Sequence, residues 1–219
     1  MNATKPATID LNRQYLYNIA LGLSLFTIFY NLLEGIVAVW FGVADETLAL
    51  FGFGLDSFIE MISGVGIAHL VWRTKQYGET QRGDFERTAL RITGYAFYAL
   101  IVVLSLSVAI NVYMQHKPLN TFWGVVISGI SIAVMWALLY GKLYVGTHLE
   151  SDSIIADANC TRACIYMSVI LLVSSGIYYL TGFAYADAIG TFGIIYFCWQ
   201  EGKECFDKAA GKATCCGHC

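Results

Sequence analysis

Six long apolar runs constrain the fold of this 219-residue chain more than any other feature of its sequence. Each run approaches the roughly 20 residues that an α-helix needs to cross the hydrocarbon core of a bilayer. Only 13% of the residues are charged, so a soluble domain of this length could not hide the apolar surface. The sequence therefore predicts an all-α membrane protein with six transmembrane helices. We expect these helices at Tyr15–Phe41, Thr47–Trp72, Thr88–Tyr113, Phe122–Tyr140, Ile154–Leu180 and Ala186–Gln200.

The connectors between the runs are short, which leaves room for a single domain in the membrane. We expect a cytosolic N-terminus (residues 1–14), a six-helix transmembrane domain (15–201) and a cytosolic Cys-rich tail (202–219).

The distribution of Lys and Arg predicts the orientation. Lys117 falls on one side of the membrane, Arg162 lies within the fifth run, and eleven cations fall on the other side. The eleven are Lys5, Arg13, Arg73, Lys75, Arg82, Arg87, Arg91, Lys142, Lys203, Lys208 and Lys212. Because cytosolic loops carry the excess of positive charge, both termini are expected in the cytosol. We expect a multi-pass protein of the cell membrane or inner membrane.

Two carboxylates lie near the middle of the second run. Asp56 and Glu60 are four residues apart, which places them on one face of a helix, about 6 Å apart along its axis. A single buried carboxyl is explained by a proton and a hydrogen bond to a neighbouring helix. Two neighbouring carboxylates repel each other, so a cation or shared protons must neutralise them.

Two thiols repeat this spacing in the fifth run, at Cys160 and Cys164. Such a pair alone is more often a packing feature, because free cysteine behaves as a small hydrophobe. Asp157 extends the pair to an i, i+3, i+7 stripe, which favours a ligand role. We therefore predict one tetrahedral cation site made by Asp56, Glu60, Cys160 and Cys164. Two thiolates disfavour magnesium, calcium and manganese and suit zinc first, or cadmium.

Other polar groups leave alternatives open. Glu34, deep in the first run, makes either a hydrogen bond between helices or part of an ion path. Gly52 and Gly54 are interpreted as sites of close helix packing. Asp187 is predicted to be an N-cap or first-turn acid.

Two further groups lie outside the apolar runs. Asp45 and Glu46 are interpreted as turn residues. The tail is either a flexible metal-capturing arm, a site of S-palmitoylation or an unimportant end. Its soft ligands are Cys215, Cys216, His218 and Cys219.

Three stretches resemble motifs of the cation diffusion facilitator superfamily. Leu48–Glu60 is similar to its second-helix motif, Ile155–Cys164 to its fifth-helix motif, and Ala184–Ile189 to the start of its sixth helix. The resemblance covers nearly all of the chain. It implies metal efflux in exchange for protons, through alternating access, in a homodimer.

The chain departs from the family pattern in three ways. Cys160 and Cys164 stand where histidine and aspartate are usual, and Glu60 replaces an aspartate. The Cys-rich tail stands in place of a soluble metal-binding domain, so we expect a short branch of the superfamily. The expected partners are the transported cation, protons, the bilayer and a second copy of the chain, with no resident cofactor and no nucleic acid.

We expect a transporter and not an enzyme, with two alternatives. One is a scaffold or accessory protein that does not transport, because a fold does not fix a function. The other is a membrane thiol oxidoreductase that uses Cys160 and Cys164. Their spacing inside a helix would strain a disulfide, and this alternative leaves Asp56 and Glu60 unexplained.

Overall fold

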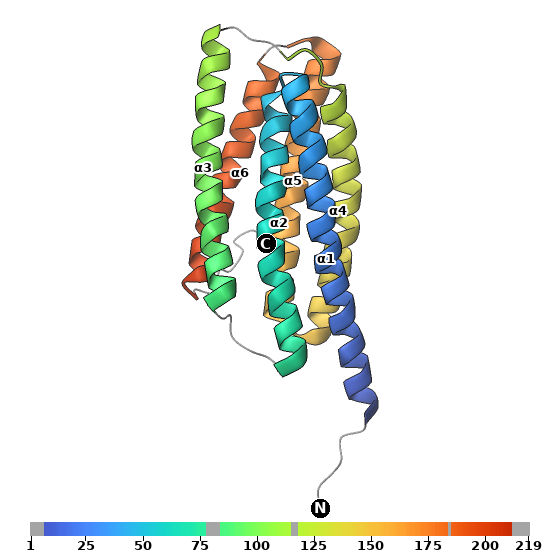
Figure 1. The fold of residues 1–219 in the computed structure, drawn as a ribbon. Helices are drawn as coiled ribbons and strands as arrows, with labels where there is room; N and C mark the ends of the chain where they lie inside the picture. The colour runs from blue at the N-terminus through green and yellow to red at the C-terminus, as the bar shows by residue number, and fades with distance from the viewer. Residues whose placement is uncertain (1–6, 78–83, 115–117, 184, 212–219) are drawn as a thin grey trace, which may run out of the picture.

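The computed structural model is a bundle of long antiparallel α-helices (Figure 1). It describes residues 7–77, 84–114, 118–183 and 185–211, and no strand occurs in these ranges. The predicted all-α class is thereby confirmed. The helices are α1 (Ala7–Ala44), α2 (Leu48–Tyr77), α3 (Asp84–Met114), α4 (Phe122–Leu149), α5 (Asp152–Thr181) and α6 (Ala186–Ala209).

Several helices run further than the apolar runs that predicted them. α4 ends at Leu149 and not at Tyr140, and α6 ends at Ala209 and not at Gln200. The reason is that backbone hydrogen bonds continue a helix regardless of whether lipid or water surrounds it. An apolar run therefore marks only the part of a helix that lipid surrounds.

Five of the described helices, α1 to α5, are long and apolar enough to cross a membrane. Their outward faces carry large exposed hydrophobic side chains, as at Phe26 and Trp40 on α1 and Leu106 on α3, which suits contact with lipid. α6 is not among the five because its second half carries several charges, at Glu201, Lys203, Glu204, Asp207 and Lys208. The chain is thus a multi-pass membrane protein, and the sixth crossing stays a prediction.

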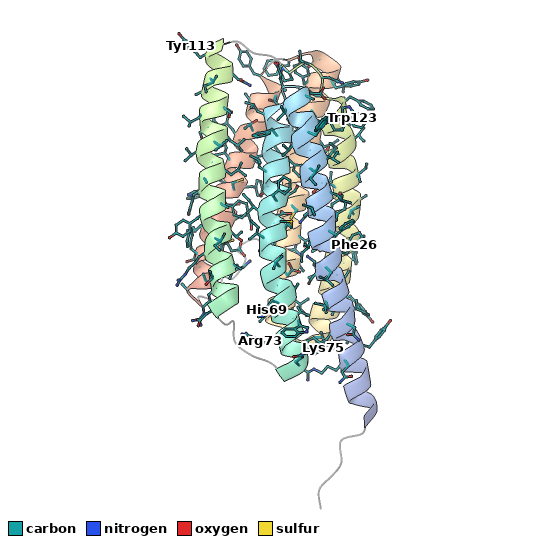
Figure 2. All side chains as sticks on the ribbon, in the orientation of Figure 1. Phe26, His69, Arg73, Lys75, Tyr113 and Trp123 are labelled. Atoms are coloured by element: carbon teal, nitrogen blue, oxygen red, sulfur yellow. The ribbon has the colours of Figure 1, made fainter. Side chains whose placement is uncertain are left out.

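α2 and α5 lie at the centre of the bundle. α1 packs against α2 and α4, α5 packs against α4 and α6, and α3 packs against α6 (Figure 1). The start of α1 and the end of α6 lie at the same end of the bundle (Figure 1). Figure 2 places Arg73 and Lys75 at this end and Tyr113 at the opposite end. Which end faces the cytosol stays a prediction from the positive charges.

Glycines allow α2 to approach its neighbours closely. A Cβ atom on Gly54 would lie 2.7 Å from the backbone nitrogen of Val39 on α1. A Cβ atom on Gly52 would lie 3.0 Å from the side chain of Leu104 on α3. The predicted packing role of both glycines is confirmed. Gly54 thus allows close approach of α2 to α1, and Gly52 allows close approach of α2 to α3.

Asp187 joins α6 to α2. It lies in the first turn of α6, as predicted, but its carboxylate caps a different helix. The backbone amides of Leu48 and Ala49 donate to it at 2.9 and 3.1 Å, which satisfies the first amides of α2. Asp45 and Glu46 lie in the turn between α1 and α2, as expected.

Candidate metal centre

Glu60 of α2 and Cys164 of α5 are in direct contact. The Cys164 thiol donates a hydrogen bond to Oε1 of Glu60. The Asn31 side-chain amide, on α1, donates to Oε2 of the same carboxylate at 3.2 Å. Glu60 therefore connects three helices, and two of the four predicted ligands lie side by side.

Asp56 lies one helical turn before Glu60 and is 1% exposed. Its Oδ1 atom has no hydrogen-bond partner among the described residues. A buried carboxylate oxygen without a partner is costly, so a proton or a cation is needed at this position. The oxygen of the Asn31 amide is also without a partner in the described part of the chain. Each of the two helices α1 and α2 thus holds one buried acceptor oxygen without a partner among the described residues.

Cys160 makes a different contact from the one predicted. The Lys208 ammonium of α6 donates to the Cys160 sulfur at 3.2 Å and forms an ion pair with Glu204 at 2.7 Å. Within the described ranges, no three His, Cys, Asp or Glu side chains are arranged to hold a metal ion. The four-ligand site therefore stays a prediction, with one of its thiols held by a lysine.

A cavity of about 40 Å³ lies inside the bundle, and residues of all six helices line it. Glu60, Cys160 and Cys164 line it, but Asp56 is not part of its described wall. A single water needs roughly 10–15 Å³, so the cavity has room for a cation or a few waters. Three of the four predicted ligands thus face one small cavity.

Asp157 lines the same cavity and shares a stripe with the two thiols, as predicted. Its Oδ2 atom lies 2.9 Å from the Lys142 ammonium of α4. The same ammonium donates to the Thr161 hydroxyl at 2.9 Å. The sequence analysis counted Lys142 only as a cytosolic cation, although it closely follows an apolar run. Its internal ion pair was missed.

Glu34 makes a hydrogen-bonded link between α1 and α2. The Tyr30 hydroxyl donates to Oε1 at 2.9 Å, and the Ser57 hydroxyl donates to Oε2 at 3.1 Å. The helix–helix interpretation of Glu34 is confirmed, because Ser57 belongs to α2 and Glu34 to α1. A role in an ion path stays a prediction.

α6 contributes residues that the sequence analysis did not place in the site. Glu201 and Cys205 line the cavity from this helix. They are four residues apart, the same signal that identified Asp56 and Glu60. The described cysteines are free thiols. The predicted accessory ligands of the tail lie outside the described residues: Cys215, Cys216, His218 and Cys219.

No protein-family model matches the chain, and no curated protein is significantly similar to it. The fold and the site define a multi-pass helical membrane protein with a small cavity lined by carboxylates, thiols and a lysine. The resemblance to the cation diffusion facilitator superfamily rests on the motifs alone.

Proposed function

We propose that this protein transports a divalent heavy-metal cation, zinc first or cadmium, out of the cytosol in exchange for protons. The contact between Glu60 and Cys164 carries the proposal. It brings a hard and a soft ligand together from two central helices at the wall of an internal cavity. The proposed ligands of the cargo are Asp56, Glu60, Cys160 and Cys164.

The chemistry of the contact supports proton exchange. A thiol that donates to a carboxylate is protonated, whereas a metal ion binds the thiolate and the carboxylate. Metal binding at Glu60 and Cys164 therefore releases the proton of the Cys164 thiol, and return of that proton releases the metal. The unpartnered oxygen of Asp56 gives a further position where a proton and a cation compete.

Cargo binding requires a local rearrangement. Cys160 lies one turn from Cys164 on α5 and must exchange the Lys208 ammonium for the metal. Asp56 must turn toward the ion from its buried position on α2. Movement of α2 and α5 relative to their neighbours would accomplish both and expose the site alternately to each side of the membrane.

Ligand type determines the proposed selectivity. Two thiolates are soft and two carboxylates are hard, a combination that suits zinc and cadmium and disfavours magnesium, calcium and manganese. Transport out of the cytosol is proposed by analogy with the family that the motifs resemble. A homodimer is proposed by analogy with the family that the motifs resemble.

The test is metal flux into proteoliposomes that contain a metal-sensitive dye. Zinc, cadmium and manganese are compared with and without a pH gradient. Three proteins are compared: the wild type, the variant Asp56→Ala, and the control variant Asp84→Ala, which changes an exposed acid. We expect gradient-dependent zinc or cadmium uptake that is lost only in Asp56→Ala. No flux of any metal, in vesicles shown to hold folded protein, would favour a scaffold or a thiol oxidoreductase.

A further inference from the structure

The charged end of α6 is held firmly against α3. Phe206 packs on two tyrosines of α3, with ring centroids 5.0 Å from Tyr95 and 5.8 Å from Tyr98. Residues two positions apart on a helix point in nearly opposite directions. Lys208 therefore points away from α3 and toward α5, where it is 7% exposed. The packing of Phe206 thus directs a lysine into the interior.

The Lys208 ammonium lies between a sulfur and a carboxylate. It is 3.2 Å from the Cys160 sulfur of α5 and 2.7 Å from the Glu204 carboxylate of α6. Burying an ammonium is expensive unless its charge is compensated. The surroundings of Cys160 are therefore suited to a cation. The ammonium of Lys208, a cation that belongs to the chain itself, already lies there.

Two further ligand groups lie near this ammonium. Glu201 and Cys205 share one face of α6, and both line the cavity together with Cys160. With Glu204 beside Lys208, the junction of α5 and α6 offers two thiols and two carboxylates. This donor set repeats the chemistry proposed for the central site.

We propose that Cys160, Cys205 and Glu201 form a second cation site, the α5–α6 site, which the Lys208 ammonium occupies until cargo metal displaces it. Glu204 receives the displaced ammonium. The inference rests on the proposed function, because Cys160 belongs to both sites and passes the metal toward Glu60 and Cys164.

A tethered cation has two consequences. Among the described residues no three His, Cys, Asp or Glu side chains are arranged to hold a metal ion, so cargo binding requires Lys208 to leave the Cys160 sulfur and the ligands to converge. A metal must also bind the thiolates strongly enough to displace an ammonium. Soft cations meet this condition, and weakly bound hard cations do not.

The test measures protection of Cys160 by zinc. The purified full-length chain is treated with N-ethylmaleimide over a range of zinc concentrations, and modification of each cysteine is measured by peptide mass spectrometry. The protein is the wild type, Lys208→Met, Lys208→Arg, and Lys203→Met as the matched control. Lys203 lies on the same helix with the same charge but is exposed. Normalising each variant to its rate without zinc removes differences in intrinsic reactivity.

Loss of the tethered cation should strengthen zinc binding. In the wild type, zinc must displace the hydrogen bond that the Lys208 ammonium donates to Cys160. Lys208→Met removes this hydrogen bond from a charged group, so Cys160 should be half-protected at a zinc concentration roughly tenfold to hundredfold lower. Lys208→Arg and Lys203→Met should stay near the wild type, because both retain a cation at position 208. Equal zinc dependence in all four proteins would overturn the tethered cation and leave the proposed transport intact.

A second variant keeps the inference testable if Lys208→Met does not fold. Cys205→Ser removes a ligand of the α5–α6 site that has no part in the central site. It should raise the zinc needed to protect Cys160, while zinc protection of Cys164 stays unchanged. An unchanged zinc dependence at Cys160 would show that Cys205 is not a ligand, and the α5–α6 site would be wrong. Failure of the transport proposal would appear instead as absent flux in the liposome assay.

Discussion

Lys142 and Asp157 form a buried ion pair between α4 and α5, with side chains 3% and 11% exposed and 2.9 Å between their charged atoms. Lys142→Met keeps the length of the side chain and removes its charge. The Asp157 carboxylate is then buried without a counter-ion, which should cost about 3–5 kcal/mol of unfolding free energy. Asp157→Leu should cost a similar amount, because it leaves the ammonium uncompensated.

The double variant Lys142→Met/Asp157→Leu shows how much the ion pair itself contributes to stability, apart from the cost of leaving one charge without its partner. Replacing both charges by apolar side chains is often neutral, so this protein should unfold within about 1 kcal/mol of the wild type. The measurement is reversible unfolding in mixed detergent micelles followed by circular dichroism. Lys203→Met, at an exposed lysine, should change stability by less than about 0.5 kcal/mol. A double variant that loses the sum of the two single losses would refute the reasoning.

Three further predictions test separate contacts. Asp187→Asn should destabilise the fold by about 1–3 kcal/mol, measured in the same unfolding assay, because it weakens the charged cap on α2. Gly54→Ala should lower the melting temperature, since its Cβ atom would meet Val39, whereas Gly129→Ala has open space and should not. Cys164→Asp should shift metal preference in liposomes toward harder cations, and an unchanged selectivity would remove Cys164 from the ligands.

The helices were predictable because their signal is local. Runs of apolar residues fixed the number and order of the helices, and the four-residue spacings fixed which side chains share a face. The spacing also anticipated that the acidic face of α2 and the thiol face of α5 meet, as Glu60 and Cys164 do. The ends of α4 and α6 were placed too early. An apolar run ends where the helix leaves the lipid, whereas the helix itself continues beyond that point.

The missed contacts join residues that are far apart in the chain. Asp187 caps Leu48 across 139 positions, and Lys208 reaches Cys160 across 48. Such contacts depend on which helices are neighbours and how far each is rotated, and no local pattern carries this information. Lys142 was misjudged for the same reason. From the sequence alone, a lysine that follows an apolar run is interpreted as a cytosolic charge. Its ion pair with Asp157 on the next helix is visible only in the structure.

X-ray absorption at the zinc edge of the purified, zinc-loaded protein tests the central claim most directly. The account predicts about two sulfur ligands near 2.3 Å and about two oxygen ligands near 2.0 Å, with one sulfur lost in Cys164→Ser and one oxygen lost in Glu60→Ala. Zinc surrounded by oxygen and nitrogen alone, or a spectrum that neither substitution changes, would contradict it.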